Sequence, residues 1–110
     1  MTVVLVDGRN VMRSRWPNVP EAELVDHVQR WAEGEGAEAV IVFDGRAPQG
    51  AIGTKGESAD DWITRRVGEL EDTHWLVTSD RELRERAGGG AERVIGGGAL
   101  LRELGLSSTH

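Results

Sequence analysis

The sequence lacks several features that would place it in common classes of protein. It contains no cysteine, which excludes disulfide bonds and thiolate metal sites and is compatible with a reducing cytoplasm. Its first apolar stretch, TVVLVDG, is far too short to span a bilayer and has no charged leader or small-residue cleavage site. A GxxxxGK motif followed by Ser or Thr is absent, and no GxGxxG follows a strand-like run, which argues against nucleotide hydrolysis and dinucleotide redox chemistry. We therefore expect a soluble cytoplasmic protein with no membrane partner.

Basic residues are in the minority. Lys and Arg number 13 against 19 Asp and Glu, which gives a formal net charge of −6. Such a chain is not a simple electrostatic binder of nucleic acid, because attraction to phosphate usually comes from a basic domain or face. The richness in Ala, Gly, Glu and Arg, with Lys55 as the only lysine, indicates a bacterial genome of high GC content. At 110 residues the chain can bury one core, so we predict a single domain over residues 1–106 and a C-terminal tail over residues 107–110.

Apolar runs of strand length alternate with helical patterns along the chain. The runs are continuous, as expected for strands covered on both faces of a parallel sheet: Val3–Val6, Ala39–Phe43, Trp75–Thr78 and Arg93–Ile95. The helices are predicted over Glu21–Glu33, Ser58–Leu70, Arg81–Ala87 and Ala99–Leu104. This alternation predicts an α/β domain with a mainly parallel central sheet. The glycine-rich segment Ala51–Thr54 is either a short extra strand or a loop.

Aspartates follow three of the predicted strands. Asp7, Asp44 and Asp80 come after the runs VVLV, VIVF and LVTS. Parallel strands end at the same edge of a sheet, and ligands in open α/β folds bind outside that edge. These three carboxylates should therefore lie at one ligand-binding edge.

A pair of adjacent aspartates stands in the first turn of the helix predicted from Ser58. Asp60 shares a helical face with Ile63 and Val67, so it should point toward the sheet, while Asp61 is rotated away by about 100°. Asp60 would then join Asp7 and Asp80.

Unpaired carboxylates brought within a few ångströms repel one another, and their pKa values rise. A divalent cation removes this conflict, and oxygen ligands without His or Cys favour Mg²⁺ or Mn²⁺ over zinc. We therefore predict that Asp7, Asp60 and Asp80 are catalytic metal ligands. Taken singly, each acid has a simpler interpretation as a helix cap or turn former, Asp44 before Gly45 above all. Asp61 also suits a solvated acid facing the helix dipole.

Several further residues are candidates for the substrate side of this site. Asn10, in DGRN, either caps a turn or orients Asp7 or a phosphate, and Ser79 either bonds a phosphate or caps the next helix. Trp16 either stacks on an unpaired base or anchors its loop on the domain. The loops expected at the carboxyl edge also carry basic residues that would form a rim suited to a phosphodiester backbone: Arg9, Arg13, Arg15, Arg46, Lys55 and Arg81.

The order and spacing of these motifs resemble the NYN domain, specifically the YacP-like branch of the PIN-like nuclease superfamily. The motifs that carry the resemblance are DGRN, VIVFDGR, GESADDWI, VTSDRELRERA and GAERVIGGGALLREL, and together they cover nearly the whole chain. The resemblance implies a three-layer α/β/α sandwich with strand order 3-2-1-4-5. It also implies that Asp7, Asp60 and Asp80 are the metal-site acids, with Asn10 matching the family's asparagine and Asp44 near the metal or substrate. The chain departs from the family at Arg9, where an aromatic or aliphatic residue is usual, and in its short 45–56 segment.

We predict from these features a Mg²⁺- or Mn²⁺-dependent endoribonuclease that acts on RNA with single-stranded character, in which Asp44, Asp61, Asn10 and Ser79 support the metal or contact the substrate. Two alternatives remain open at this stage. One is an RNA- or ribosome-associated binding module that keeps the acidic pocket but cleaves nothing. The other is a metal-dependent phosphatase acting on a small phosphoester. The sequence leaves the oligomeric state undetermined.

Overall fold

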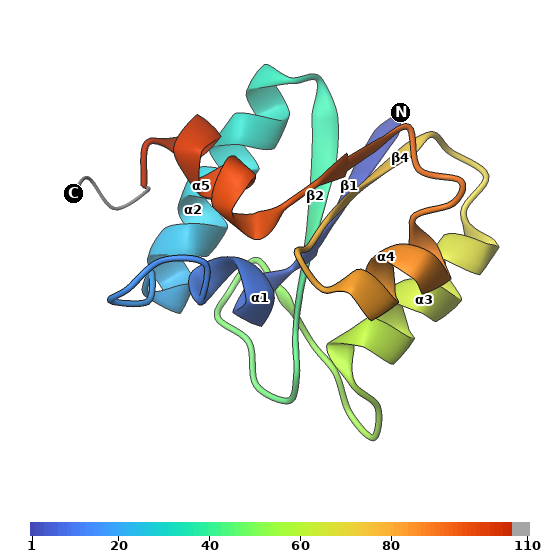
Figure 1. Cartoon of the computed structure of the whole chain (residues 1–110), viewed down its shortest axis with the longest axis horizontal. Helices are drawn as coiled ribbons and strands as arrows, with labels where there is room; N and C mark the ends of the chain where they lie inside the picture. The colour runs from blue at the N-terminus through green and yellow to red at the C-terminus, as the bar shows by residue number, and fades with distance from the viewer. Residues whose placement is uncertain (107–110) are drawn as a thin grey trace.

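A five-stranded, wholly parallel sheet forms the centre of the structure (Figure 1). The structure is a computed structural model and describes residues 1–106, so the predicted tail 107–110 lies outside the described residues. The strands are β1 (Thr2–Asp7), β2 (Ala37–Phe43), β3 (Ile52–Gly53), β4 (His74–Val77) and β5 (Arg93–Ile95). Their order in the sheet is β3-β2-β1-β4-β5. The mainly parallel α/β architecture is therefore confirmed, and so is the strand order that the family resemblance implied.

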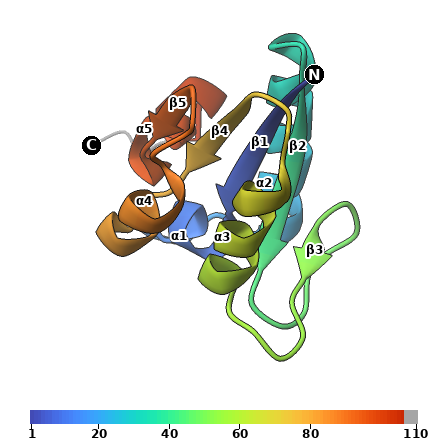
Figure 2. The same ribbon diagram turned by 90° about the vertical axis from the view of Figure 1, so that its right-hand side faces the viewer.

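Helices cover both faces of the sheet, which gives three layers. One face carries α1 (Gly8–Met12), α2 (Glu21–Gly34) and α5 (Gly97–Leu104), and the other carries α3 (Ala59–Glu69) and α4 (Arg81–Ala87) (Figures 1 and 2). Of the helices in residues 1–106, none is long and apolar enough to cross a membrane.

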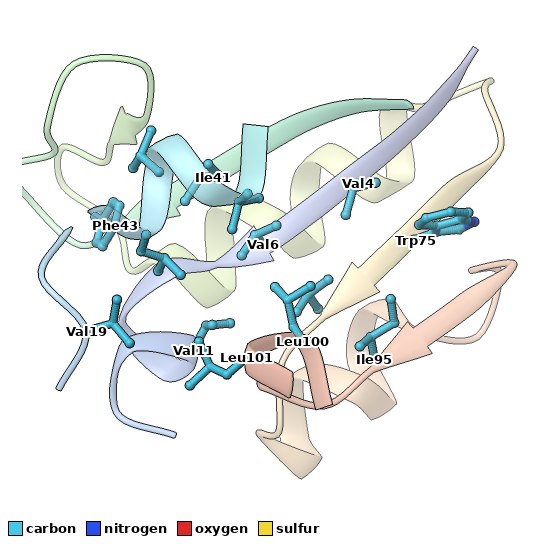
Figure 3. Close-up of a cluster of buried hydrophobic side chains, with 14 of the residues drawn as sticks. Val4, Val6, Val11, Val19, Ile41, Phe43, Trp75, Ile95, Leu100 and Leu101 are labelled. Carbon is cyan, nitrogen blue, oxygen red and sulfur yellow. The ribbon is translucent and has the colours of Figure 1, made fainter. Parts of the chain in front are cut away.

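Two hydrophobic clusters hold the layers together. Successive side chains of a strand point to opposite faces, so β1 sends Val4 and Val6 to the cluster under α1, α2 and α5 (Figure 3). Val3 and Leu5 go to the second cluster, under α3 and α4. Burial on both faces explains why the strand is a continuous apolar run.

The structure adds one short helix that the sequence analysis did not predict. Residues 8–12 were expected to form a loop, but they form α1 directly after β1. Val11 is fully buried in the first cluster, and Gly8 lets the helix lie against Phe43, because a Cβ at Gly8 would stand 2.7 Å from the ring. Packing rather than helix propensity therefore forms α1.

The other predicted elements are found close to their expected bounds. Helix α4 and strand β5 match residue for residue, and Ser58 caps α3 by accepting a hydrogen bond from the Asp61 N–H. The open question at residues 51–54 is settled as a strand of two residues, β3, which pairs with Val42 and Phe43. Strand β4 begins one residue earlier than predicted and ends at Val77, so Thr78 follows it.

Candidate functional site

A pocket of about 390 Å³ lies at the carboxyl edge of the sheet. Strands β1 and β4 are neighbours in the sheet although other strands and helices separate them in sequence. Ligands in α/β folds bind at such a switch point, outside the carboxyl ends of the strands. Four acids, two arginines and an asparagine line the pocket: Asp7, Arg9, Asn10, Arg13, Asp44, Asp60 and Asp80.

The fold brings together the acids that the sequence placed at this edge. Asp7 is the last residue of β1, and Asp44 follows β2 directly. Asp80 is the N-cap of α4, in the loop after β4. Asp60 comes from the first turn of α3. The pocket is therefore assembled from four separate chain segments, each delivering one carboxylate.

Asp7 is the most buried of the four acids. It is only 6% exposed, and burial, followed by the nearby negative charge of Asp60, raises its pKa to about 6. The Thr78 hydroxyl donates a hydrogen bond to Asp7 Oδ2 at 3.2 Å, which lowers the pKa and so offsets part of this rise. The surroundings of Asp7 therefore disfavour the charged form of its carboxyl group.

Asp44 and Asp80 each serve a helix as well as the pocket. Asp44 Oδ1 accepts a hydrogen bond of 2.6 Å from the Ala59 N–H at the start of α3. Asp80 Oδ1 accepts one of 3.1 Å from the Leu83 N–H in α4. The capping interpretation is correct for Asp80, the N-cap of α4. Asp44, interpreted from the sequence above all as a turn former, instead accepts from the first residue of a helix whose N-cap is Ser58. Both residues also line the pocket. The Asp44 contact additionally holds the first turn of α3, which carries Asp60, next to the end of β2.

The adjacent aspartates of α3 lie in different surroundings, as their spacing on the helix predicted. Asp60 lines the pocket and is half-buried, and burial and the charges of Asp80 and Asp44 raise its pKa. Asp61 lies outside the pocket lining with its side chain 56% exposed, and the Arg86 guanidinium donates to its Oδ1 at 2.8 Å. The placement of Asp61 fits its alternative interpretation as a solvated first-turn acid.

The donor set of the pocket suits a hard divalent cation. Its acids provide oxygen atoms only, which Mg²⁺ and Mn²⁺ prefer. The pKa values of Asp7 and Asp60 are raised first by burial and then by neighbouring carboxylates, and a bound cation would favour the charged form of both. Within residues 1–106, however, no three His, Asp or Glu side chains already form a group that could hold a metal ion. Binding would therefore require the carboxylates to move closer together than they lie in the structure.

The pocket also has basic and polar lining residues. Arg9 donates a hydrogen bond of 3.1 Å to the backbone oxygen of Asp44, and its buried Nε has no hydrogen-bond partner among the described residues. Asn10 Oδ1 accepts from the Ser79 N–H at 2.7 Å, and Ser79 Oγ accepts from the Gly97 N–H at 2.8 Å. Asn10 and Ser79 therefore join the ends of β1 and β4 to the start of α5, which is a structural role.

The remaining candidates do not contribute to the pocket lining in the described part of the chain. Arg15 holds its own loop, since it donates to the backbone oxygens of Pro17 at 3.0 Å and Leu106 at 2.6 Å. Arg46, Lys55 and Arg81 are exposed. Trp16 is 80% exposed, so its interpretation as a packed loop anchor is wrong.

Thr78 is a site residue that the sequence indicated as the last residue of a predicted strand. It is fully buried, and the hydroxyl that donates to Asp7 Oδ2 also accepts a hydrogen bond from the Asp80 N–H at 3.1 Å. One hydroxyl thus joins the acids at the ends of two neighbouring strands. The pairing of β1 with β4 is the signal that could have found this contact, since Val6 stands opposite Val77.

Replacing Thr78 with valine should raise the pKa of Asp7 above its value of about 6, because the substitution removes a hydrogen bond that favours the charged carboxylate. Thr78→Ser keeps the hydroxyl and should leave the pKa close to that of the wild type. The measurement is an NMR titration of the Asp7 carboxyl carbon in the three metal-free proteins. Equal pKa values in the valine and serine variants would contradict the role given to the hydroxyl.

Comparisons with known proteins identify the fold. No protein-family model and no curated protein matches the sequence. Among solved structures, a point mutant of Rae1 (YacP) from Bacillus subtilis superposes with a TM-score of 0.74 at 24% identity, over 96% of this chain and 76% of that one. A second crystal structure of Rae1 (YacP) from Bacillus subtilis gives a TM-score of 0.71 at 23% identity, over 96% and 74% of the two chains. The chain therefore has a fold similar to that of YacP.

Proposed function

We propose that this protein is a Mg²⁺- or Mn²⁺-dependent endoribonuclease of the YacP-like branch of the NYN and PIN-like nucleases. In this proposal Asp7, Asp60 and Asp80 hold the ion, and the pocket receives a phosphodiester of an RNA strand. The similarity of the fold to YacP supports the family assignment, together with the motifs DGRN, VIVFDGR and GESADDWI.

The observation that carries the proposal is that one pocket is lined by both carboxylates and arginines. Four acids line it together with Arg9, Asn10 and Arg13, which come from α1 and the residue after it. A cation bound by the carboxylates and a phosphate bound by the arginines would neutralise both kinds of charge. The unpartnered Nε of Arg9 supports this arrangement, because a buried donor without an acceptor is unfavourable and a phosphate oxygen would satisfy it.

The chain's own residues have separate tasks in this chemistry. Arg9 and Arg13 bind the phosphate and fix its orientation. Asp7, Asp60 and Asp80 would hold the ion, and a carboxylate of this set can help accept the proton that an attacking water loses. When bound, the divalent ion would lower the pKa of that water and place positive charge next to the phosphate oxygens.

A binding module for RNA or the ribosome that performs no cleavage is the second candidate. It is favoured by one observation, that the acids in residues 1–106 are not already grouped to hold an ion. It predicts affinity for RNA without turnover in Mg²⁺ or Mn²⁺, so the same experiment separates the two functions.

The test is the opening of a labelled circular RNA, which only an endonuclease can linearise. We expect cleavage by the purified protein in Mg²⁺ or Mn²⁺, no cleavage in EDTA, and recovery when excess Mg²⁺ is added. Asp7→Asn should lower the rate by about 100-fold or more, because it removes an anionic ligand of the ion. Asp26→Asn makes the same change of charge at an exposed position of α2 and should cleave like the wild type.

Cleavage that survives EDTA, or that is equal in Asp7→Asn and the wild type, would rule the mechanism out. Tight binding of the circle with no linear product in either metal would assign the protein to the binding module instead.

A further inference from the structure

We infer that Trp16 is a stacking platform for an unpaired base of the substrate, and that this platform makes the protein selective for single-stranded over double-stranded RNA. The inference rests on the proposed function for the identity of the ligand as RNA. It does not rest on cleavage, because binding alone reveals it.

Trp16 differs from the other tryptophans in its exposure. It is 80% exposed, whereas Trp75 is only 8% exposed. Trp31 packs against Trp75 with their ring centroids 6.0 Å apart, and Trp62 packs on the second hydrophobic cluster. A tryptophan in water contributes little to the folded state and leaves a large apolar surface uncovered. Within residues 1–106, its indole ring is therefore free to receive a flat partner on its face.

The loop that carries Trp16 is held in place on both sides of it. Ser14 Oγ donates to the Asn10 backbone oxygen at 2.8 Å, and Arg15 donates to the Pro17 and Leu106 backbone oxygens. Beyond Pro17, the fully buried Val19 donates its N–H to the Met12 backbone oxygen at 3.2 Å. An aromatic ring on a fixed backbone loses little conformational freedom on binding, which favours its use as a contact.

The loop also begins at a residue that lines the pocket. Arg13 lines the pocket, and three residues of chain can separate Trp16 from it by at most about 11 Å. Figure 1 shows the loop between α1 and α2 continuing outward from α1, at the same end of the sheet as the loops that follow β2 and β4. An RNA strand with one phosphate in the pocket could therefore reach Trp16 within a few nucleotides.

The charge of the segment that carries Trp16 favours a polyanion as the partner. Residues 8–20, GRNVMRSRWPNVP, contain three arginines and no acidic residue, in a chain with a net charge of −6. Single-stranded RNA combines regularly spaced phosphates with flat bases that are exposed for stacking, whereas the bases of a duplex are stacked on one another already. This combination of arginines and an exposed indole fits the single strand and gives no comparable contact to the duplex.

The test measures the binding of a labelled single-stranded RNA and of its duplex in EDTA, which keeps both intact. Trp16→Ala should weaken single-strand binding by about 5- to 100-fold and leave duplex binding within about twofold. Trp16→Phe keeps a stacking ring and should stay close to the wild type in affinity. Unlabelled single strand should quench the fluorescence of the wild type and of Trp62→Phe, and much less that of Trp16→Phe.

The inference is overturned if Trp16→Ala, shown to be folded by circular dichroism, binds the single strand as tightly as the wild type does. It is equally overturned if the variant weakens single-strand and duplex binding by the same factor, if no RNA binds, or if Trp16 governs only self-association of the protein.

Cleavage that proceeds with unchanged affinity in Trp16→Ala would leave the proposed function intact. Trp16-dependent binding without cleavage would support the platform while the proposed nuclease fails.

Discussion

Replacing Asp60 with asparagine is expected to lower the rate of RNA cleavage by about 100-fold or more, because the change removes a carboxylate that faces the proposed ion. The same change at Asp61 should keep the rate within about fivefold, since an exposed ion pair contributes only about 1 kcal/mol or less. The two residues are neighbours in sequence and in the first turn of α3, but Asp60 lines the pocket while Asp61 bonds Arg86.

The comparison controls for effects on the helix. Both variants remove one acid from the same first turn, so they weaken the favourable interaction with the helix dipole to a similar extent. Cleavage rates should be measured over a series of Mg²⁺ concentrations, because loss of a ligand that is only partly essential would raise the Mg²⁺ concentration needed for cleavage. Equal losses in the two variants would show that the position of the carboxylate in the pocket does not matter, and the proposed site would fail.

The sequence was sufficient to place the acids because each signal was local. Asp7 and Asp44 come directly after continuous apolar runs, and parallel strands deliver such residues to one edge. The orientation of Asp60 followed from the helical spacing that links it to the buried Ile63. These features need only strand direction and helical periodicity, both of which a single sequence carries.

What the sequence could not provide depends on contacts between distant segments. Helix α1 contains Gly and Asn, which are poor helix formers, and it forms because Val11 is buried and Gly8 fits against Phe43. The two hydrogen bonds of Thr78 depend on the pairing of β1 with β4.

The roles of residues in the Trp16 loop were equally hidden in the sequence. Arg15 was assigned to the basic rim, but its guanidinium holds the loop to the backbone oxygen of Leu106, 91 residues away in the chain. Composition alone gives no indication that Trp16 is exposed, because most tryptophans are largely buried.

The second large effect is that of Asp7→Asn on the stability of the metal-free protein, which should rise although the rate of cleavage falls. Asp7→Asn should raise the free energy of unfolding of the metal-free protein at pH 7.5. Folding raises the pKa of Asp7 from 3.8 to about 6, which corresponds to a penalty of up to about 3 kcal/mol at neutral pH. Asparagine is neutral and has nearly the same shape, and its Oδ1 can still accept the hydrogen bond from Thr78.

The dependence of this effect on pH follows from proton binding. Between pH values of about 4 and 6 the folded protein holds more protons than the unfolded chain, so the contribution of Asp7 to stability falls as the pH rises through this window. Above about pH 6 the full penalty persists, and below about pH 4 the carboxyl is protonated in both states and the penalty vanishes. Urea unfolding of the wild type and Asp7→Asn should therefore differ most at pH 7.5 and least near pH 3.5.

Mg²⁺ should reverse the order of the two proteins. An ion that binds only the folded state stabilises it by about 4.1 kcal/mol at one thousand times its dissociation constant, which exceeds the penalty of up to about 3 kcal/mol, and this gain requires the carboxylate that Asp7→Asn lacks. The wild type should therefore gain stability with added Mg²⁺, while Asp7→Asn stays nearly constant and Asp26→Asn follows the wild type. A metal-free Asp7→Asn protein less stable than the wild type at pH 7.5 would show that Asp7 contributes to the fold. The expected result instead means that this buried carboxylate is retained at the expense of stability, as is common for groups that serve function.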